Sequence, residues 1–426
     1  MTPRLFTLSA ETPVELEQAT EELARQLESG MESPAVHSAM PCRRIVVADS
    51  PLEAARRLRE GRSKSVFTGE LNPRRPIVFM FSGVGDQYPG MTAGLYRHLP
   101  VYRQELDRCL RLLEPEVGMD LRSLLFPPDA PTEGKPGLAS LFDQRRSSQE
   151  IHQTLAAQPL AFATQYALAR TMLSLGIRPR ALIGYSLGEY VAGCLAGVFS
   201  LDDALRLTAL RARLVNAQPE GAMLAVTSAP GPLAPHSQAG VSVAALNGPD
   251  LTVLAGPVEA IELLGKRLID QEIACRRLAT SHAFHSPMMD PVVEALRDAF
   301  AGVSLSPPLI PFLSNVTGRW IKAHEATDPG YWARHSRETI RFADELTELW
   351  RLLEPVPVEL GPGQMLINLA LRHPAHQSSG QPLALRTLPG VFESRTDLEL
   401  FLTMLGQLWA TGIDIDWSVV TFDEGN

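Results

Sequence analysis

Cysteine is scarce in this sequence, and the cysteine residues lie far apart along the chain. The chain has four in 426 residues: Cys42, Cys109, Cys194 and Cys275. They form no Cys-x-x-Cys pair, so the pattern argues against a disulfide framework and against a zinc site. Buried free thiols are the ordinary interpretation.

Charge and long apolar runs are limited as well. Charged residues make up 20% of the chain, below the usual value of about 25%, and 39 basic residues against 48 acidic ones give a net charge of −9. This balance, without a Lys/Arg tract, argues against nucleic acid or a membrane surface as a partner. No apolar run approaches the ~20 residues that span a bilayer, and the N-terminus lacks the regions of a secretory signal. We therefore expect a globular enzyme in the cytoplasm.

The chain is nevertheless rich in apolar residues, which are spread over several units. Apolar residues make up 45% of the chain, enough for a large core, and the length suggests about two to four domains. Residues 1–75 are typical of a small α/β unit. A strand at Leu5–Ser9 is followed by a helix with Thr12 at its N-cap, Pro13 in the first helical position and Glu15 in the third.

Two apolar runs end in glycine further along the chain. They are Pro76–Gly83 and Arg180–Gly184, and each is typical of a strand buried on both faces of a parallel sheet. Helical periodicity between them indicates α/β layers. From about residue 221 to 280, short strands and one helix at 257–271 predict a small sheet with helices on one face. We therefore predict an α/β fold in which a small α+β unit is inserted into the larger domain.

Gly184-Tyr-Ser-Leu-Gly188 has the G-x-S-x-G pattern between a predicted strand and a predicted helix. In that context the glycines allow a sharp turn that projects the Ser186 hydroxyl at the sheet edge, as in a nucleophile elbow. The N–H groups that open the helix would face developing negative charge. Ser186 is thus the candidate nucleophile.

A serine nucleophile needs a base, usually a histidine. His285 is the best candidate, because its segment lies where the inserted unit rejoins the main sheet, and such junction loops often carry sites. His282, three residues earlier, is the competing candidate. Both are also compatible with ordinary polar loop histidines.

Two other segments carry candidate groups. The loop Ser82–Gly90 lacks the lysine of a phosphate-binding loop, so the Val84 N–H could instead serve an oxyanion hole, or the loop is a plain turn. The helix predicted to begin at Ser200 carries Arg206, Arg211 and Arg213. Each is by default solvated or salt-bridged, but a buried one beside the serine would bind a carboxylate through two hydrogen bonds.

Together these segments resemble the acyltransferase domain of modular polyketide synthases and the related malonyl-CoA:acyl-carrier-protein transacylases. The matching phrases occur in family order: FMFSGVGDQYPGM, GYSLGEYVAGCLAGV, AALNGPDLTVLAG, SHAFHSPMM, PFLSNVTG, YWARHSRETIRF and ELGPGQML. The resemblance implies an α/β-hydrolase-like core with an inserted ferredoxin-like subdomain. It divides the chain into a ketosynthase–acyltransferase-type linker (1–75), a large subdomain in two parts (76–218 and 282–390), a small subdomain (219–281) and a post-acyltransferase linker (391–426).

The resemblance also implies roles for individual residues. Ser186 would be the nucleophile, His285 its general base and Arg211 the ligand of a substrate carboxylate. The backbone amides of Val84 and Leu187 would form the oxyanion hole, and the carbonyl of His335 would orient His285. The substrate pocket would include Gln158, Tyr185, Asn247, His282 and Phe284.

The implied reaction is ping-pong transfer of a malonyl-type group from CoA to the phosphopantetheine thiol of an acyl carrier protein. No bound cofactor or metal is expected, acyl-CoA is the donor substrate, and a ketosynthase domain is a further partner through the N-terminal linker. The phrase His282-Ala-Phe-His285 resembles that of malonyl enzymes. Tyr185 replaces the usual histidine, which leaves methylmalonyl or an unusual extender as alternatives. A serine acyl hydrolase is the alternative of another class.

Overall fold

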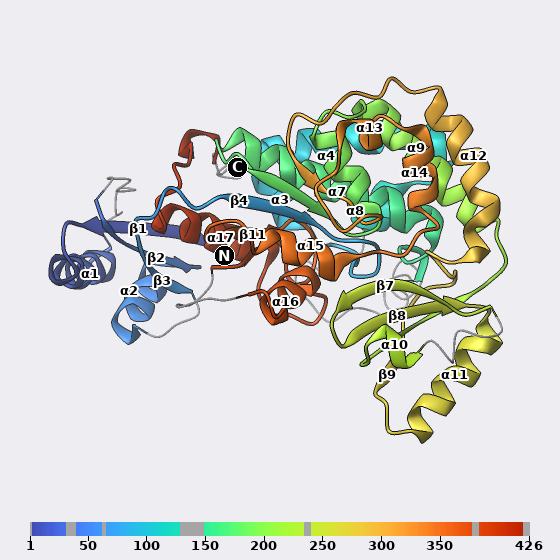
Figure 1. The fold of residues 1–426 in the computed structure, drawn as a ribbon. Helices are drawn as coiled ribbons and strands as arrows, with labels where there is room; N and C mark the ends of the chain where they lie inside the picture. Colours follow the sequence, from blue (N-terminus) through green and yellow to red (C-terminus); the bar gives the residue numbers. More distant parts are fainter. Residues whose placement is uncertain are drawn as a thin grey trace, which may run out of the picture.

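The computed structural model describes residues 2–30, 40–61, 65–127, 149–233, 240–376 and 383–420. Its strands form three sheets, which lie side by side along the molecule with helices packed around them (Figure 1).

The first sheet belongs to the N-terminal unit and is antiparallel. Its strands are β1 (Arg4–Ala10), β2 (Cys42–Ala48) and β3 (Val66–Glu70), in the order β1-β2-β3. Helices α1 (Pro13–Glu28) and α2 (Pro51–Glu60) complete the unit. The predicted start of α1 is confirmed: the Thr12 hydroxyl accepts from the Glu15 N–H, and the Glu15 carboxylate accepts from the Thr12 N–H. Strand β3 is not among the strands expected from the sequence.

The central sheet has five parallel strands in the order β10-β5-β4-β11-β12. The strands are β4 (Ile77–Phe81), β5 (Ala181–Gly184), β10 (Phe312–Leu313), β11 (Val356–Glu359) and β12 (Leu385–Arg386). Every residue of β4 and β5 is buried, as expected for a parallel sheet covered on both faces. The predicted α/β class with a parallel sheet is confirmed.

Successive side chains of β4 pack in two different hydrophobic cores, because the side chains of a strand point alternately to opposite faces of the sheet. Phe79 and Phe81 pack in the main core with α4 (Pro100–Val117), α7 (Thr154–Ser174) and α8 (Leu187–Leu195). Val78 and Met80 pack in a second core, which includes side chains of the helices around the opposite face. Further helices in the described ranges are α3 (Ala93–His98), α5 (Leu121–Leu125), α9 (Leu201–Asn216), α12 (Asp290–Ala301), α13 (Ala323–Ala326), α14 (Pro329–His335), α15 (Phe342–Leu349) and α16 (Met365–Arg372), with one-turn helices at Pro287–Met289 and Trp417–Val419.

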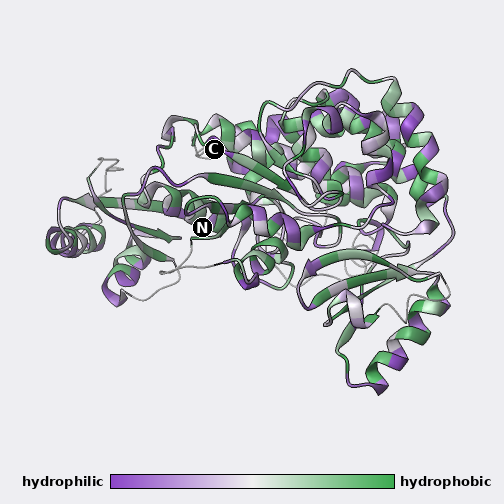
Figure 2. Cartoon of the chain, viewed as in Figure 1, coloured by the Kyte–Doolittle hydropathy of each residue, from purple (hydrophilic) through white to green (hydrophobic). Residues whose placement is uncertain are grey.

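The third sheet lies within the segment predicted as an inserted unit. Strands β6 (Ala222–Val226), β7 (Ser242–Gly248), β8 (Leu251–Gly256) and β9 (Cys275–Arg277) pair antiparallel in the order β7-β8-β6-β9. With α10 (Pro230–Leu233) and α11 (Val258–Asp270) they follow a β-α-β-β-α-β succession, which is ferredoxin-like. Hydrophobic and hydrophilic residues alternate along α11, whose apolar side packs on this sheet (Figure 2).

The closing helix α17 (Asp397–Ala410) returns to the N-terminal sheet. The Arg43 guanidinium donates to the Trp409 carbonyl over 2.7 Å and lies 4.8 Å from the centre of the Trp409 ring. Asp397, at the other end of α17, accepts from the Leu95 N–H over 2.9 Å. The helix therefore joins the N-terminal unit to the central domain.

No helix in the described ranges is both long and apolar enough to cross a membrane.

Candidate active site

Ser186 sits in a strained turn between β5 and α8. It is the N-cap of α8, with φ 52° and ψ −116°, and such a conformation in a residue other than glycine costs of order 1–3 kcal/mol. Both motif positions require glycine for steric reasons. A Cβ at Gly188 would lie 2.0 Å from the Phe81 carbonyl oxygen, and one at Gly184 would lie 2.2 Å from the Glu189 nitrogen. The turn thus has the geometry of a nucleophile elbow.

The His285 ring lies directly against Ser186. Its Nε2 is 2.7 Å from the Ser186 Oγ, and its Nδ1 is 2.9 Å from the Glu338 carbonyl oxygen. Since a carbonyl only accepts, Nδ1 carries the proton, and Nε2 of the neutral ring is free to accept from the serine hydroxyl. His285 also has a positive φ, 56°. The structure therefore brings together the two residues that the sequence analysis paired.

The orienting carbonyl differs from the expected one. We predicted the carbonyl of His335, but His285 Nδ1 donates to the carbonyl of Glu338, three residues further along. His335 is the last residue of α14, and the chain turns after it, which carries the Glu338 carbonyl to the ring. The His335 carbonyl also raises the pKa of His285, but less than the Glu338 carbonyl does.

The surroundings of His285 disfavour its protonation. Burial, followed by the charges of His335 and Arg211, lowers the pKa of His285 to about 3. The ring is therefore held neutral, the form in which it can act as a base.

Arg211, on α9, is buried to 1% exposure. Its Nε donates to the Ser336 hydroxyl over 3.1 Å, and its Nη1 donates to the Gln158 side-chain oxygen. Burial lowers its pKa. Arg206 and Arg213, on the same helix, are more exposed and pair with acidic side chains.

Two donors beside each other at Arg211 have no acceptor among the described residues. Arg211 Nη2 and Gln158 Nε2 are both buried and find no hydrogen-bond partner within the described part of the chain. No described carboxylate forms an ion pair with Arg211 either. A buried cation without a counter-ion is costly, so the arrangement is suited to an anionic ligand.

The two backbone groups expected at an oxyanion hole belong to the residue after Ser186 and to the glycine loop that follows β4. The Leu187 N–H opens α8, where the first N–H groups of a helix lack an intrahelical acceptor. The glycine loop with Val84 passes close by, since a Cβ built on Gly83 would lie 3.7 Å from the Ser186 Cβ.

The remaining predicted pocket residues come from both subdomains. The Tyr185 ring meets Phe342 edge-on, with 5.2 Å between ring centres. Burial raises the pKa of Tyr185 to about 12, although a hydrogen bond with Asn247 acts the other way. His282 lies 6.2 Å from Phe284 between ring centres, and its Nδ1 lies 2.9 Å from the Ser281 hydroxyl.

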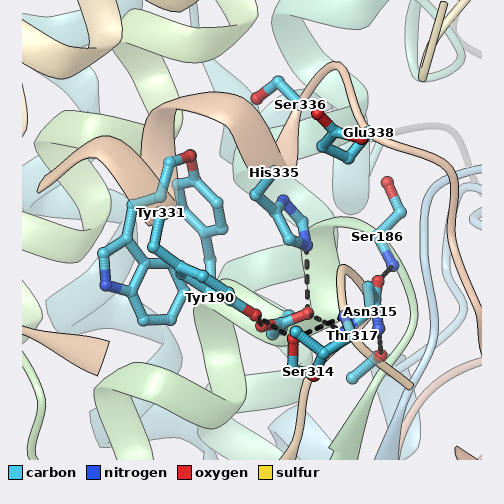
Figure 3. Close-up of polar contacts among 12 residues, drawn as sticks. Ser186, Tyr190, Ser314, Asn315, Thr317, Tyr331, His335, Ser336 and Glu338 are labelled. Carbon is cyan, nitrogen blue, oxygen red and sulfur yellow. Dashed lines mark hydrogen bonds and ion pairs between the residues drawn. The ribbon is translucent and has the colours of Figure 1, made fainter. Parts of the chain in front are cut away.

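A group of buried polar residues, connected by hydrogen bonds to the Ser186 backbone, was not predicted from the sequence; Figure 3 shows part of it. They are Glu189, Ser314, Asn315, Tyr331 and Glu345, all buried. The Ser186 N–H donates to Asn315 Oδ1 over 2.6 Å, and the Asn315 N–H donates to Glu189 over 2.8 Å. The only signal in the sequence is that all except Glu345 fall inside phrases that carry the family resemblance.

No group of three or more His, Cys, Asp or Glu side chains is placed to hold a metal ion in the ranges that the structure describes. The site consists of a serine, a histidine and hydrogen-bond donors.

Comparison with known proteins identifies the family of this chain. The family model named acyl transferase domain matches residues 78–415. One polypeptide of the phenolphthiocerol/phthiocerol polyketide synthase of Mycobacterium tuberculosis is 34% identical over 98% of this chain, and the match covers 28% of that polypeptide. Polyketide synthase GfsA of Streptomyces halstedii is 32% identical over 97% of this chain, which covers 6% of that protein. The chain therefore spans less than a third of either relative.

Solved structures agree in fold. The acyl transferase domain of ZmaA superposes with a TM-score of 0.87 at 30% identity, over 98% of this chain and 96% of that one. The acyl transferase domain of SpnD, in complex with 2-(pent-4-yn-1-yl)malonyl, gives a TM-score of 0.82 at 35% identity, over 99% and 98%. This chain belongs to the acyl transferase domain family of polyketide synthases and is an acyltransferase.

Proposed function

We propose that this acyltransferase moves a malonyl-type acyl group from CoA to the phosphopantetheine thiol of an acyl carrier protein, through an ester on Ser186. The observation that supports a malonyl-type substrate is the buried Arg211, whose Nη2 lacks a partner among the described residues.

The first half-reaction loads the serine. His285 Nε2 takes the proton of the Ser186 hydroxyl as the oxygen attacks the thioester carbonyl. The N–H groups of Leu187 and Val84 stabilise the oxyanion of the tetrahedral intermediate. The intermediate collapses, the C–S bond breaks, and the CoA sulfur leaves with the proton that His285 returns.

The second half-reaction runs the same steps with another thiol. The phosphopantetheine thiol gives its proton to His285 and attacks the serine ester. The C–O bond breaks, and Ser186 recovers its proton from His285. These steps require no cofactor, and acyl-CoA enters as the donor substrate.

Arg211 and Gln158 explain why the acyl group should carry a free carboxylate. A carboxylate accepts several hydrogen bonds, and a guanidinium can supply two of them side by side. The open Arg211 Nη2 and Gln158 Nε2 would both be satisfied by such a group. Binding it also neutralises a charge that burial otherwise makes unfavourable.

The relatives support the same substrate class. The SpnD domain was solved with a substituted malonyl group, and the sequence relatives are polyketide synthases. We extend this to an acyl carrier protein as acceptor and to a ketosynthase as a neighbour of the N-terminal unit. The cytoplasm is the proposed location.

Phe284 favours malonyl over methylmalonyl. Its side chain is buried to 8% exposure beside His282, and in the proposed pocket it fills the space that an α-methyl group needs. A methyl group is worth about 1–3 kcal/mol of discrimination.

The test is intact-mass measurement of the protein after incubation with malonyl-CoA, methylmalonyl-CoA or acetyl-CoA, followed by addition of a carrier protein. We expect a malonyl adduct that Ser186→Ala abolishes and that passes to the carrier. Equal loading of acetyl and malonyl would refute the role of Arg211. Release of free acid without transfer would instead favour a hydrolase.

A further inference from the structure

Asn315 contacts the backbone of the Ser186 turn from below. It lies just after the short strand β10 and is buried to 2% exposure. Its Oδ1 accepts from the Ser186 N–H over 2.6 Å, and its Nδ2 donates to the Gly184 carbonyl over 2.5 Å. One side chain thus bridges the two ends of the strained segment (Figure 3).

The orientation of this amide is determined by its neighbours. Nδ2 also donates to Glu345 Oε1 over 2.8 Å, so both of its protons are used. A flipped amide would set a donor against the Ser186 N–H and an acceptor against the Gly184 carbonyl. Only one orientation satisfies all three partners.

The Asn315 backbone is fixed as well. Its N–H donates to Glu189 over 2.8 Å, and its carbonyl accepts from the Arg341 N–H over 2.9 Å. Glu189 in turn accepts from the Tyr331 hydroxyl and lies 3.1 Å from His335 Nε2. The side chain that reaches Ser186 is therefore mounted on a connected, buried framework.

The consequence for Ser186 follows from the peptide groups around it. The group before Ser186 is held at its N–H by Asn315 and at the Tyr185 carbonyl by the Gly188 N–H over 3.0 Å. The group after Ser186 is held at its carbonyl by the Glu189 N–H over 3.0 Å. The planes of these two groups determine φ and ψ of Ser186, and hence the directions of the Oγ and of the Leu187 N–H.

We propose that Asn315 is a positioning residue, which holds the Ser186 backbone in its strained, positive-φ conformation so that the hydroxyl faces His285 and the Leu187 N–H faces the developing oxyanion. This inference rests on the proposed nucleophilic role of Ser186. A misplacement of about 1 Å costs roughly 100-fold in rate, whereas the hydrogen bonds of Arg211 within the described residues go to Ser336 and Gln158 and do not involve Asn315.

The test compares three variants by their acylation rate constant and KM with malonyl-CoA, and by thermal unfolding. Asn315→Ala removes the acceptor and both donors, whereas Asn315→Asp retains the oxygen that faces Ser186. Thr387→Val is the matched control, because the buried Thr387 hydroxyl makes two hydrogen bonds at the end of another strand of the same sheet, to Glu359 and Gly361. If Asn315→Ala cannot be purified, Asn315→Ser replaces it with the same expectation.

We expect Asn315→Ala to acylate about 100-fold more slowly, with KM changed less than about 3-fold. Asn315→Asp retains the acceptor for the Ser186 N–H but sets an oxygen against the Gly184 carbonyl and Glu345, so it should acylate faster than Asn315→Ala and more slowly than the wild type. Thr387→Val should keep the wild-type rate despite a comparable fall in unfolding temperature. The inference is overturned if Asn315→Ala keeps the wild-type rate, or if the rates of all three variants fall in proportion to their stability.

A fluorophosphonate probe separates this inference from the proposed function. It reacts with an activated serine without using Arg211. If wild-type protein is labelled at Ser186 by the probe but not by malonyl-CoA, the proposed substrate is wrong. The effect of Asn315→Ala on the labelling rate then still decides the positioning role.

Discussion

The Ser186 Oγ and the His285 Nε2 lie 2.7 Å apart, and both residues hold positive φ angles, 52° and 56°. Neither residue is glycine, so each backbone is strained. Four non-glycine residues in the described ranges have a positive φ, and two of them are the residues that the proposed reaction requires. The turn at each of these two residues sets a neutral histidine, bonded through Nδ1 to the Glu338 carbonyl, against the serine hydroxyl.

This pair predicts an unusual pH profile. A histidine with the ordinary pKa of about 6.5 is mostly protonated at pH 5, and the rate of a reaction that needs it as base would fall roughly 30-fold between pH 8 and pH 5. Burial, with the charges of His335 and Arg211, lowers the pKa of His285 to about 3. We therefore expect the acylation rate constant to change less than about 2-fold over this range.

Stability has to be followed in the same experiment. Because the pKa of His285 is lower in the folded state, the unfolded chain binds more protons below about pH 6.5, and acidification reduces the free energy of unfolding. Thermal unfolding at each pH separates that loss from an effect on rate. A rate that halves near pH 6.5 in fully folded protein would contradict the prediction.

Arg211→Ala should change which acyl group is loaded. A hydrogen bond to a charged group contributes about 1.5–3 kcal/mol, so we expect malonyl loading to fall roughly 10- to 100-fold while acetyl loading is retained. Arg213→Ala is the matched control, because Arg213 lies on the same helix but is partly exposed and pairs with Glu116. Loading rates for both CoA esters give the measurement, and equal losses for the two esters would rule out carboxylate binding by Arg211.

Much of the site was predictable because its sequence signals are local. The G-x-S-x-G phrase depends on two glycines whose contacts lie in the turn itself or on the adjacent strand. The cap of α1 depends on residues three positions apart. In such cases the chemistry of a few neighbouring residues determines the geometry.

The features that the sequence analysis missed depend on long-range contacts. Asn315 and Ser186 are in contact although they lie 129 positions apart in the sequence, and Arg43 and Trp409 although they lie 366 positions apart. Glu338 replaced His335 as the orienting carbonyl because the turn after α14 decides which carbonyl faces the ring. Strand β3 contains Gly69, which weakens its strand signal, and the close approach of the Ala410 carbonyl explains why glycine stands there.

Gly188→Ala should damage the elbow and the fold together. The new Cβ would lie 2.0 Å from the Phe81 carbonyl oxygen, so α8 must move away from β4. We expect a loss of roughly 1–3 kcal/mol in the free energy of unfolding and slower labelling of Ser186. Urea unfolding and fluorophosphonate labelling measure the two effects.

Gly265→Ala is the control for this change. Gly265 lies within α11, and its nearest neighbours, on Leu224, are 3.8 Å or more from an added Cβ. Alanine favours a helix over glycine by up to about 1 kcal/mol, so this variant should be as stable as the wild type or more so. Equal stability of Gly188→Ala and Gly265→Ala would contradict the steric account.

Trp409→Ala should weaken the attachment of the N-terminal unit. Trp409 is 3% exposed on α17 and lies against the Arg43 guanidinium. Truncating a buried aromatic side chain costs about 3–5 kcal/mol, and here the loss falls where α17 covers the sheet of β1, β2 and β3. We expect a lower urea midpoint, with acylation of the folded protein unchanged.

Phe392→Ala provides the comparison for that experiment. Phe392 precedes α17 in the chain and is 100% exposed, so its removal should alter the free energy of unfolding by no more than about 0.5 kcal/mol. Limited proteolysis then locates the effect of Trp409→Ala, because an N-terminal unit released from α17 is cut before the central domain. If Trp409→Ala and Phe392→Ala unfold at the same urea concentration, α17 does not stabilise the N-terminal unit through this contact.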